Sequence, residues 1–455
     1  MNIINPATEE LIGEIQEDSR DSLDKKFQIL KESRKNWTAA GLSYRIDIIQ
    51  KFSAAMERDI EALAAVLTGE VGKPLQQSRN EIQGARTRIK WMIDNAQKYL
   101  GDEQMSSDAK MEERISYEPL GVICNISAWN YPWLVGVNVF ITALLAGNAV
   151  MYKPSEYATL TGMEIEKLLY KSGLPSGIFQ LAAGGSQVGE WLLDLPFDGY
   201  FFTGSYATGK SIYEKCALKM VPCQLEMGGK DPLYVADDIN DVRQVAEATA
   251  DGAFYNNGQS CCAVERIYVH ESVYDEYVRE FKNEVASWKT GEPTTPGVYF
   301  GPLTRKAQLE TLERQVSDAV SKGAHVLAGG RRMNRKGYYF EPTILTETTH
   351  DMLVMKEESF GPVIGIMKVK NDEEAVGLMS DTEYGLTASV YSADRSRAEK
   401  ILTQLNTGTG YWNCCDRVSA PLPWSGRNHS GFGATLSHAG FHSFVRPRAW
   451  HLRSS

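Results

Sequence analysis

The chain has 455 residues, 43% of them hydrophobic and 23% charged, which is typical of a soluble globular enzyme with two or three domains. A net charge of −10 argues against nucleic acid or an anionic membrane as a partner. The sequence has no apolar run long enough to span a membrane and no secretory signal at its N-terminus, so we expect a cytoplasmic protein.

The cysteines and histidines show no pattern of metal ligation. There is no CxxC pair, no HExxH motif and no cysteine pair with closely spaced histidines. Seven cysteines in so long a chain also argue against a disulfide framework. We therefore expect reduced thiols and no metal site.

Residues 43–101 carry apolar side chains at helical spacings of three and four, with a break at Gly72-Lys73-Pro74. We interpret these stripes as faces of a hydrophobic core that contain no functional site. Residues 112–120 alternate between apolar and polar side chains, the pattern of a half-buried antiparallel strand.

A different pattern begins at residue 121, where short apolar runs alternate with helical stretches. Buried strands are expected at 121–127, 148–154, 177–183 and 199–205. Strands separated by helices form right-handed βαβ units, so this region predicts a parallel, doubly wound sheet of the Rossmann type.

The alternation resumes after Gly229, with strands at 232–236 and 265–270 and a long helix that ends at Gly323. This pattern predicts a second α/β domain. The tail at 441–452 has apolar residues too dispersed for a core helix, and we expect a strand or arm that needs a partner.

Two adjacent cysteines, Cys261 and Cys262, follow a bend at Gly258-Gln259-Ser260. A cysteine acts as a nucleophile only as the thiolate. A turn rich in glycine and amide side chains offers backbone N–H groups to a thiolate or to a neighbouring oxyanion. Taken alone, such a pair is more often structural.

Polar residues of chemical interest lie at the ends of the predicted strands. The GSYATG stretch at 204–209 lets a pyrophosphate approach backbone N–H groups, and Lys153 with Glu156 suits the two hydroxyls of a ribose. Asn130 can donate to an oxyanion, and Glu226, among apolar residues and glycines, is expected to have the raised pKa of a general base. Each has an ordinary alternative: a βα turn, a solvated loop or a paired carboxylate.

The order of these motifs is more specific than any one of them. The stretches AWNYP, KPSE, FTGS, LEMGGK, NNGQSC and EESFGPV resemble those of the aldehyde dehydrogenase superfamily, from INPAT at 4–8 to SGFG at 430–433. The resemblance implies an α/β fold with three parts. These are a doubly wound, Rossmann-like cofactor domain (1–108 and 121–229), an α/β catalytic domain (230–428) and a small β oligomerisation arm (109–120 and 429–455). The arm would bridge the subunits of a homodimer or homotetramer.

The resemblance also assigns roles to single residues. Cys261 is the implied nucleophile, Asn130 forms the oxyanion hole with the Cys261 N–H, and Glu226 is the base that activates water. The residues expected to bind the dinucleotide are Lys153, Glu156, Gly185, Gly204, Ser205, Glu358 and Phe360. NAD is expected, and NADP is less favoured because the Glu156 carboxylate would repel a 2′-phosphate.

The implied reaction oxidises an aldehyde to a carboxylic acid through a cysteine thiohemiacetal and a thioester that water hydrolyses. Ala434-Thr435 stands where many members have an arginine and a second acid, so Glu226 is expected to work without that acid. Succinate-semialdehyde members carry an arginine where this chain has Asn138, which favours an apolar or neutral aldehyde here. The residues expected to line the substrate tunnel are Tyr131, Asn138, Trp412 and Trp424.

Three alternatives stay open. The first is a succinate-semialdehyde dehydrogenase, because the tail LSHAGFHSF is similar to that of such enzymes. The second is a dehydrogenase that acylates coenzyme A, which would not need Glu226. The third is a non-catalytic binding or structural protein, which would not need Cys261, Asn130, Glu226 and Glu358 together. Cys262 is expected to be a packing residue.

Overall fold

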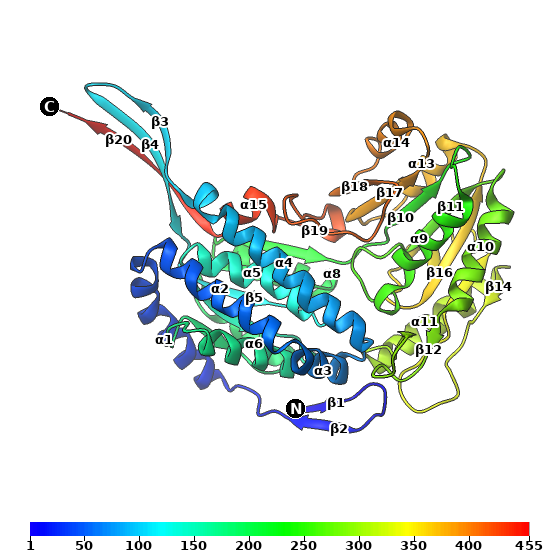
Figure 1. The fold of residues 1–455 in the computed structure, drawn as a ribbon, viewed down its shortest axis with the longest axis horizontal. Helices are drawn as coiled ribbons and strands as arrows, with labels where there is room; N and C mark the ends of the chain where they lie inside the picture. The colour runs from blue at the N-terminus through cyan, green and yellow to red at the C-terminus, as the bar shows by residue number, and fades with distance from the viewer. Residues whose placement is uncertain (455) are drawn as a thin grey trace.

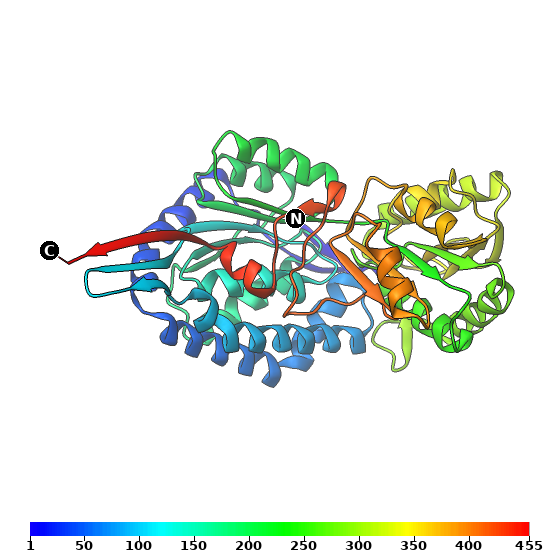
Figure 2. The same ribbon diagram turned by 90° about the horizontal axis from the view of Figure 1, so that it is seen from above.

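The computed structural model describes residues 1–454, which form two lobes and a projecting arm (Figure 1). The larger lobe contains most of the N-terminal half of the chain, and the smaller lobe contains most of the remainder (Figures 1 and 2). The C-terminal strand runs out along the arm in both views. No helix within residues 1–454 is long and apolar enough to cross a membrane.

The larger lobe is built on a six-stranded sheet in the order β19-β9-β8-β5-β6-β7. Its strands are β5 (Val122–Ile126), β6 (Ala149–Lys153), β7 (Phe179–Leu181), β8 (Gly199–Gly204), β9 (Cys223–Met227) and β19 (Gly431–Phe432). The first five pair in parallel, and β19 joins β9 in the antiparallel orientation. The four strands expected between residues 121 and 205 are confirmed.

Helices cover both faces of this sheet. They are α1 (Arg20–Ala39), α2 (Leu42–Arg58), α3 (Ile60–Val71), α4 (Leu75–Leu100), α5 (Pro132–Leu145), α6 (Thr159–Lys171), α7 (Ser186–Asp194) and α8 (Tyr206–Ala217). Successive strand residues point to opposite faces. Ile123 of β5 packs in the cluster of α2 to α6, whereas Cys124 packs with α1, α7 and α8. The doubly wound arrangement is therefore confirmed.

The smaller lobe has a seven-stranded sheet in the order β14-β15-β16-β11-β10-β17-β18, with only β14 antiparallel to its neighbour. Its strands are β10 (Pro232–Val235), β11 (Arg266–His270), β14 (His325–Ala328), β15 (Thr343–Thr346), β16 (Val363–Val369), β17 (Thr387–Tyr391) and β18 (Thr409–Trp412). Its helices are α9 (Val242–Phe254), α10 (Tyr274–Ser287), α11 (Lys306–Ser321), α12 (Leu353–Lys356), α13 (Asp372–Ser380) and α14 (Arg395–Leu402). The second α/β domain is confirmed.

Two small two-stranded sheets complete the lobes. They are β1 (Asn2–Ile4) with β2 (Leu11–Glu14), and β12 (Lys289–Thr290) with β13 (Val298–Phe300).

The arm is an antiparallel sheet of β3 (Glu103–Ser107), β4 (Met111–Pro119) and β20 (Val445–Arg453), with β4 in the centre. β20 pairs with β4 along its whole length, from Val445 opposite Pro119 to Arg453 opposite Met111. The strand expected at 112–120 is therefore β4, and β4 is also the partner that the C-terminal tail was expected to need.

Strand pairing corrects two expected domain boundaries. The arm begins at Glu103 rather than at 109, because β3 pairs with β4. Residues 431–444 belong to the larger lobe, because β19 pairs with β9 and α15 (Ser437–His442) packs on α4 and α5. β3 is polar and exposed and β19 has two residues, so neither has a hydrophobic pattern that marks it in the sequence. Ser455, the last residue of the expected arm, lies outside the described residues.

Candidate active site

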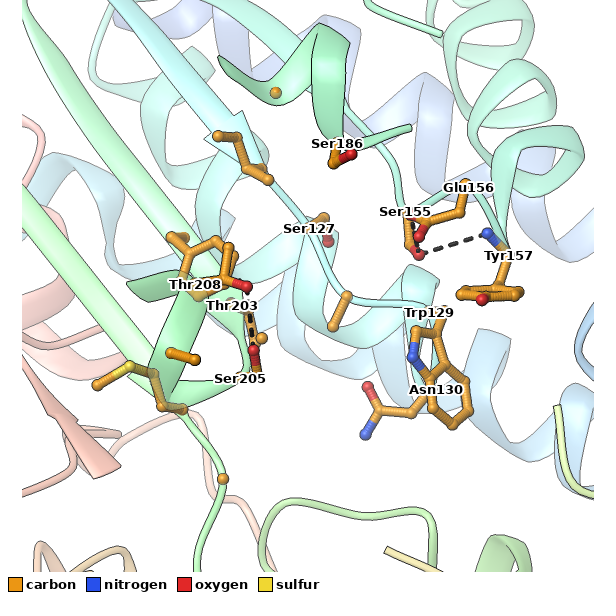
Figure 3. Close-up of a pocket in the computed structure, with 18 of the residues that line it drawn as sticks. Ser127, Trp129, Asn130, Ser155, Glu156, Tyr157, Ser186, Thr203, Ser205 and Thr208 are labelled. Atoms are coloured by element: carbon orange, nitrogen blue, oxygen red, sulfur yellow. Dashed lines mark hydrogen bonds between the residues drawn. The ribbon is translucent and has the colours of Figure 1, made fainter. Parts of the chain in front are cut away.

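A cleft of about 690 Å³ opens at the carboxyl ends of β5, β6 and β8, where doubly wound sheets bind their ligands. Figure 3 shows side chains from these strand ends around the opening. The expected site residues that line the cleft are Asn130, Lys153, Glu156, Gly204, Ser205, Cys261, Glu358 and Phe360. The last three come from the smaller lobe and its connection, so the cleft lies between the lobes. Gly185 directly precedes Ser186, which also lines the cleft.

The turn before the cysteines is rigid. It contains a short 3-10 helix, η1 (Tyr255–Gly258), in which Asn257 has a φ of 57° and donates from Nδ2 to the Gly301 carbonyl at 2.7 Å. Gly258 has a φ of 67°, and a β carbon there would lie 2.4 Å from the Gly361 carbonyl oxygen. Only glycine adopts this positive φ without strain and has no β carbon to clash with Gly361. The turn therefore presents Cys261 in one fixed place.

The two cysteines have different surroundings. Cys261 is half-buried and lines the cleft. Cys262 is only 5% exposed, and its thiol donates to Asp416 Oδ1 at 3.0 Å, as does the Ser260 hydroxyl. A hydrogen bond to Cys261, together with burial, holds the pKa of the Cys262 thiol well above its ordinary value. Cys262 therefore stays a protonated donor behind the residue that faces the cleft.

A buried ion pair positions Asn130. Lys73 and Glu81 form a salt bridge with no exposed surface. Lys73 Nζ donates to the Asn130 carbonyl at 2.8 Å, and Glu81 Oε1 accepts from the backbone N–H of Trp133 at 2.9 Å. Asn130 Nδ2 donates to the Gln259 carbonyl at 3.0 Å. Its second N–H has no acceptor in residues 1–454 and suits an oxyanion next to Cys261.

Glu226 is buried on β9, two residues before Gly228, which lines the cleft. Its Oε1 accepts from the Thr435 hydroxyl at 2.5 Å and from Gln224 Nε2 at 3.2 Å. Burial raises the pKa of Glu226 to about 7, although the Thr435 hydrogen bond acts in the opposite direction. The raised pKa agrees with the expectation for a general base. Both donors bind Oε1, so Oε2 remains for a proton.

The side of the cleft lined by Lys153 and Glu156 combines a buried cation with an exposed acid. Lys153 is 5% exposed, and in residues 1–454 its ammonium donates only to the Pro154 carbonyl, at 3.2 Å. Glu156 is exposed, and its Oε2 accepts from Ser155 Oγ at 3.1 Å. A β carbon on Gly185 would meet nothing within 4 Å. A buried ammonium with unused N–H bonds, beside a carboxylate and open space, fits the hydroxyls of a dinucleotide ribose.

The side of the cleft lined by Glu358 and Phe360 is fixed by a second buried pair. Lys230 Nζ binds Glu265 Oε2 at 2.6 Å, and Glu265 accepts from the backbone N–H groups of Ser359 and Phe360 at 3.0 Å each. Phe360 has a left-handed φ of 47°, which this carboxylate stabilises. Burial raises the pKa of the adjacent Glu358 to about 8. Lys230 and Glu265 were not among the expected site residues.

The expected substrate residues are only partly brought together. Trp424 and Cys262 lie in one buried apolar cluster, and the half-buried residues packed against it include Cys261 and Leu134. Tyr131 precedes α5 and lies under the Lys73 ammonium, 3.7 Å from its ring centre. Trp412, on the edge strand β18, is not part of this cluster. Its indole N–H donates to the Ser392 carbonyl at 2.9 Å, so it packs within the smaller lobe.

Asn138 supports an arginine from another helix. Its Oδ1 accepts from Arg88 Nη1 at 3.0 Å, and the same nitrogen lies 3.4 Å from the Leu134 carbonyl. Arg88 comes from α4, which was interpreted as a core face without a functional site. No carboxylate in residues 1–454 forms an ion pair with this guanidinium. Its charge nevertheless reaches Glu226, whose pKa it lowers.

The comparisons with known proteins agree with this geometry. The profile of the aldehyde dehydrogenase family matches residues 1–449. The chain belongs to this family. Aminoaldehyde dehydrogenase 1 of Pisum sativum, a peroxisomal protein, is 35% identical over 454 residues, which cover 97% of this chain and 90% of that protein.

Solved structures of aldehyde dehydrogenase relatives share the whole fold. The 3,6-anhydro-L-galactose dehydrogenase in complex with NAP has a TM-score of 0.95 and 31% identity, covering 99% of this chain and 96% of that one. PnpE in complex with nicotinamide adenine dinucleotide has a TM-score of 0.95 and 28% identity, covering 99% and 94%. The aldehyde dehydrogenase fold expected from the motifs is confirmed.

Six residues around the site were not among the expected site residues: Lys73, Glu81, Arg88, Lys230, Glu265 and Thr435. A signal for two of them was present. Glu81 and Arg88 are seven residues apart in the apolar stripe of α4, so they lie on one face, two turns from each other. Charged side chains inside a core stripe need buried partners, which is a reason to expect a polar site there.

Proposed function

We propose that this aldehyde dehydrogenase oxidises an aldehyde to the carboxylic acid with NAD, through covalent intermediates on Cys261. The observation that carries the proposal is the convergence of Cys261 and Asn130 with both halves of a dinucleotide site on one cleft. Glu226, a buried carboxylate whose pKa burial raises to about 7, lies on the strand that ends at this cleft.

The first step adds the Cys261 thiolate to the aldehyde carbon and gives a thiohemiacetal. The oxyanion that forms is stabilised by the free N–H of Asn130 and the backbone N–H of Cys261. Because Lys73 and Gln259 fix Asn130 before the substrate arrives, little reorganisation accompanies this step.

A bound nicotinamide ring supplies the acceptor for the hydride that leaves the thiohemiacetal carbon. The thioester on Cys261 is then open to water. Glu226 removes a proton from that water through Oε2, since Oε1 is occupied by Thr435 and Gln224. This base supports hydrolysis rather than transfer to coenzyme A.

NAD is the proposed dinucleotide because Glu156 is an exposed acid at the ribose end of the cleft. Its charge repels the 2′-phosphate of NADP, and its oxygens accept from ribose hydroxyls. One solved relative is a complex with NAP and the other with nicotinamide adenine dinucleotide, so the proposal rests on Glu156 itself.

The substrate is proposed to be an aldehyde without a positive charge. The sequence favoured an apolar or neutral aldehyde, whereas the name of the Pisum sativum relative indicates an aminoaldehyde. Arg88 argues against an aminoaldehyde, because its cation repels an ammonium group in the same pocket. Trp424 and Leu134 add apolar surface beside Cys261.

The decisive experiment measures NADH formation in the first turnover. A burst stoichiometric with active sites is expected for the unaltered protein and for Cys262→Ala, and no burst for Cys261→Ala. Loss of the burst in Cys262→Ala alone would reject Cys261 as the nucleophile. An absence of NADH with every aldehyde would favour the non-catalytic alternative.

The arm is proposed to join subunits of a homodimer or homotetramer. It projects from the larger lobe, on the side away from the smaller lobe (Figure 1), and its outer strands expose Met105 (60%) and Leu452 (40%). Light scattering of the full chain and of a chain ending at Phe444 tests this, because only the full chain is expected to be oligomeric. A cytoplasmic location stays a prediction, since the Pisum sativum relative is peroxisomal by name.

A further inference from the structure

The Arg88 guanidinium has unused hydrogen-bonding capacity. Of its five N–H donors, only those on Nη1 have acceptors in residues 1–454, the Asn138 side chain at 3.0 Å and the Leu134 carbonyl at 3.4 Å. Nε and Nη2 of Arg88 have no hydrogen-bond partner in residues 1–454, and neither atom is completely buried. The remaining donors therefore face open space, although the side chain as a whole is half-buried.

Arg88 lies near the catalytic residues, because Cys262, Glu226 and Cys261 raise its pKa against the lowering effect of burial. Leu134 and Asn138 lie one turn apart on α5, the helix that starts directly after Asn130 and Tyr131. Leu134 packs against the same apolar cluster as Cys261. Asn138 lies six residues into α5, which is about 9 Å along the helix axis. Arg88 is therefore bonded one to two turns along α5 from its start, beyond Asn130 and Tyr131.

No carboxylate in residues 1–454 forms a direct ion pair with Arg88, although Glu226 and Glu81 raise its pKa. Glu81, two turns away on α4, is paired with Lys73. Glu226 is bound by Thr435 and Gln224. Burial lowers the pKa of Arg88, yet an arginine remains protonated in a protein, so a half-buried cation is left in the pocket.

We propose that Arg88 is a specificity-determining residue that binds a carboxylate at the distal end of the aldehyde substrate. The planar guanidinium offers Nε and Nη2 side by side, which matches the two oxygens of a carboxylate. Asn138 then acts as a support that orients the guanidinium. The inference rests on the proposed function and names its substrate class.

With Arg88 as the carboxylate ligand, Asn138 no longer indicates a neutral aldehyde. Its presence favoured a neutral aldehyde only because it takes the place of an arginine on α5. The structure supplies a cation to the same place from α4, so the pocket combines an apolar wall with a single positive charge.

Three aldehydes of equal chain length test the inference: an unbranched alkanal, its ω-carboxylate and its ω-trimethylammonium derivative. The unaltered protein is expected to give at least a tenfold higher kcat/KM for the carboxylate than for the alkanal, and the lowest value for the cation. Arg88→Met should lower kcat/KM for the carboxylate by roughly 10- to 100-fold and for the alkanal by less than about threefold.

Arg86→Met is the matched control. Arg86 lies on the same helix but pairs with Glu57 at 2.7 Å, so its loss should leave the ratio of carboxylate to alkanal unchanged. Retained alkanal oxidation shows that Arg88→Met is folded. An equal loss for all three aldehydes, or the same change of ratio in Arg86→Met, would overturn the proposal.

A binding experiment separates this inference from the proposed function. Calorimetry on Cys261→Ala measures the affinity of a straight-chain dicarboxylate, with and without the added Arg88→Met change. The affinity is expected to fall at least tenfold when Arg88 is lost. If no aldehyde is oxidised but this difference is seen, the proposed function fails and the carboxylate site stands. If aldehydes are oxidised but the affinities are equal, the proposed function stands and the role of Arg88 is overturned.

Discussion

The Thr435 hydroxyl donates to Glu226 Oε1 at 2.5 Å, in a place where both residues are almost fully buried. Many relatives were expected to carry an acid at this position. A second carboxylate would raise the pKa of Glu226 by repulsion, whereas the hydroxyl lowers it by a hydrogen bond to the charged form. Thr435 thus acts as a positioning residue that leaves one carboxylate oxygen free for water.

The first prediction concerns Thr435→Val. Glu226 is a base only when ionised, so hydrolysis of the thioester rises with pH through the Glu226 pKa of about 7. Without the hydroxyl that pKa increases, and the rise in kcat moves to higher pH. We expect kcat at pH 6 to fall roughly three- to tenfold more than at pH 9. Thr435→Ser is the control and should retain the original profile; a parallel loss at all pH values would reject the hydrogen bond as the cause.

The second prediction concerns the buried pair of Lys73 and Glu81. Lys73→Met leaves an unpaired buried carboxylate and should reduce the free energy of unfolding by about 3–5 kcal/mol. The double change Lys73→Met with Glu81→Leu should recover most of that stability. Its kcat should stay low, because the Asn130 carbonyl then keeps only the longer 3.3 Å bond from Asn256 Nδ2 and the Trp133 N–H loses its acceptor. Denaturant unfolding and steady-state rates measure both effects. Full recovery of kcat in the double variant would contradict the positioning role.

The third prediction compares two glycines of positive φ. Gly258→Ala places a β carbon 2.4 Å from the Gly361 carbonyl oxygen, whereas Gly323→Ala, at a φ of 99°, meets nothing within 4 Å. Both should be destabilised by roughly 1–3 kcal/mol because alanine is strained at positive φ. Only Gly258→Ala should also lose activity, because only its turn carries Cys261. Thermal unfolding and burst amplitude distinguish the two, and equal activity in both variants would count against the rigid turn.

The fourth prediction addresses the dinucleotide. Glu156→Gln removes the charge at the ribose end of the cleft and should raise kcat/KM for NADP by roughly tenfold while lowering that for NAD. Glu164→Gln, a surface change on α6 that breaks only the pair with Lys167, should alter neither value. Initial rates with each dinucleotide measure the ratio. If the unaltered protein already has the higher kcat/KM for NADP, Glu156 does not select NAD.

The helices and strands were predictable because each has a local period. The alternation at 112–120 and the apolar runs from 121 to 205 became β4, β5, β6, β7 and β8. The same rule failed for β3 and β19, because an exposed or two-residue strand gains its stability from the partner strand and carries no pattern of its own.

The candidate site was predictable where its residues form short motifs at strand ends. Asn130, Lys153, Cys261 and Glu358 all line the cleft, since the ends of parallel strands meet at one edge of a sheet. Arg88 and Lys73 were not predictable in this way. They belong to helical stripes, and a stripe specifies a buried face without specifying the partner of a charge within it.

By itself, the sequence determined the family, the two α/β domains and the group of residues that meet at the cleft, because these depend on local periods and contiguous motifs. Only the tertiary structure decided that Cys262 donates to Asp416 and that Thr435 binds Glu226. It also decided that Asn138 is partnered by a cation from α4. Each of these is a contact between residues far apart in the chain, and such a contact exists only after the helices and sheets have packed.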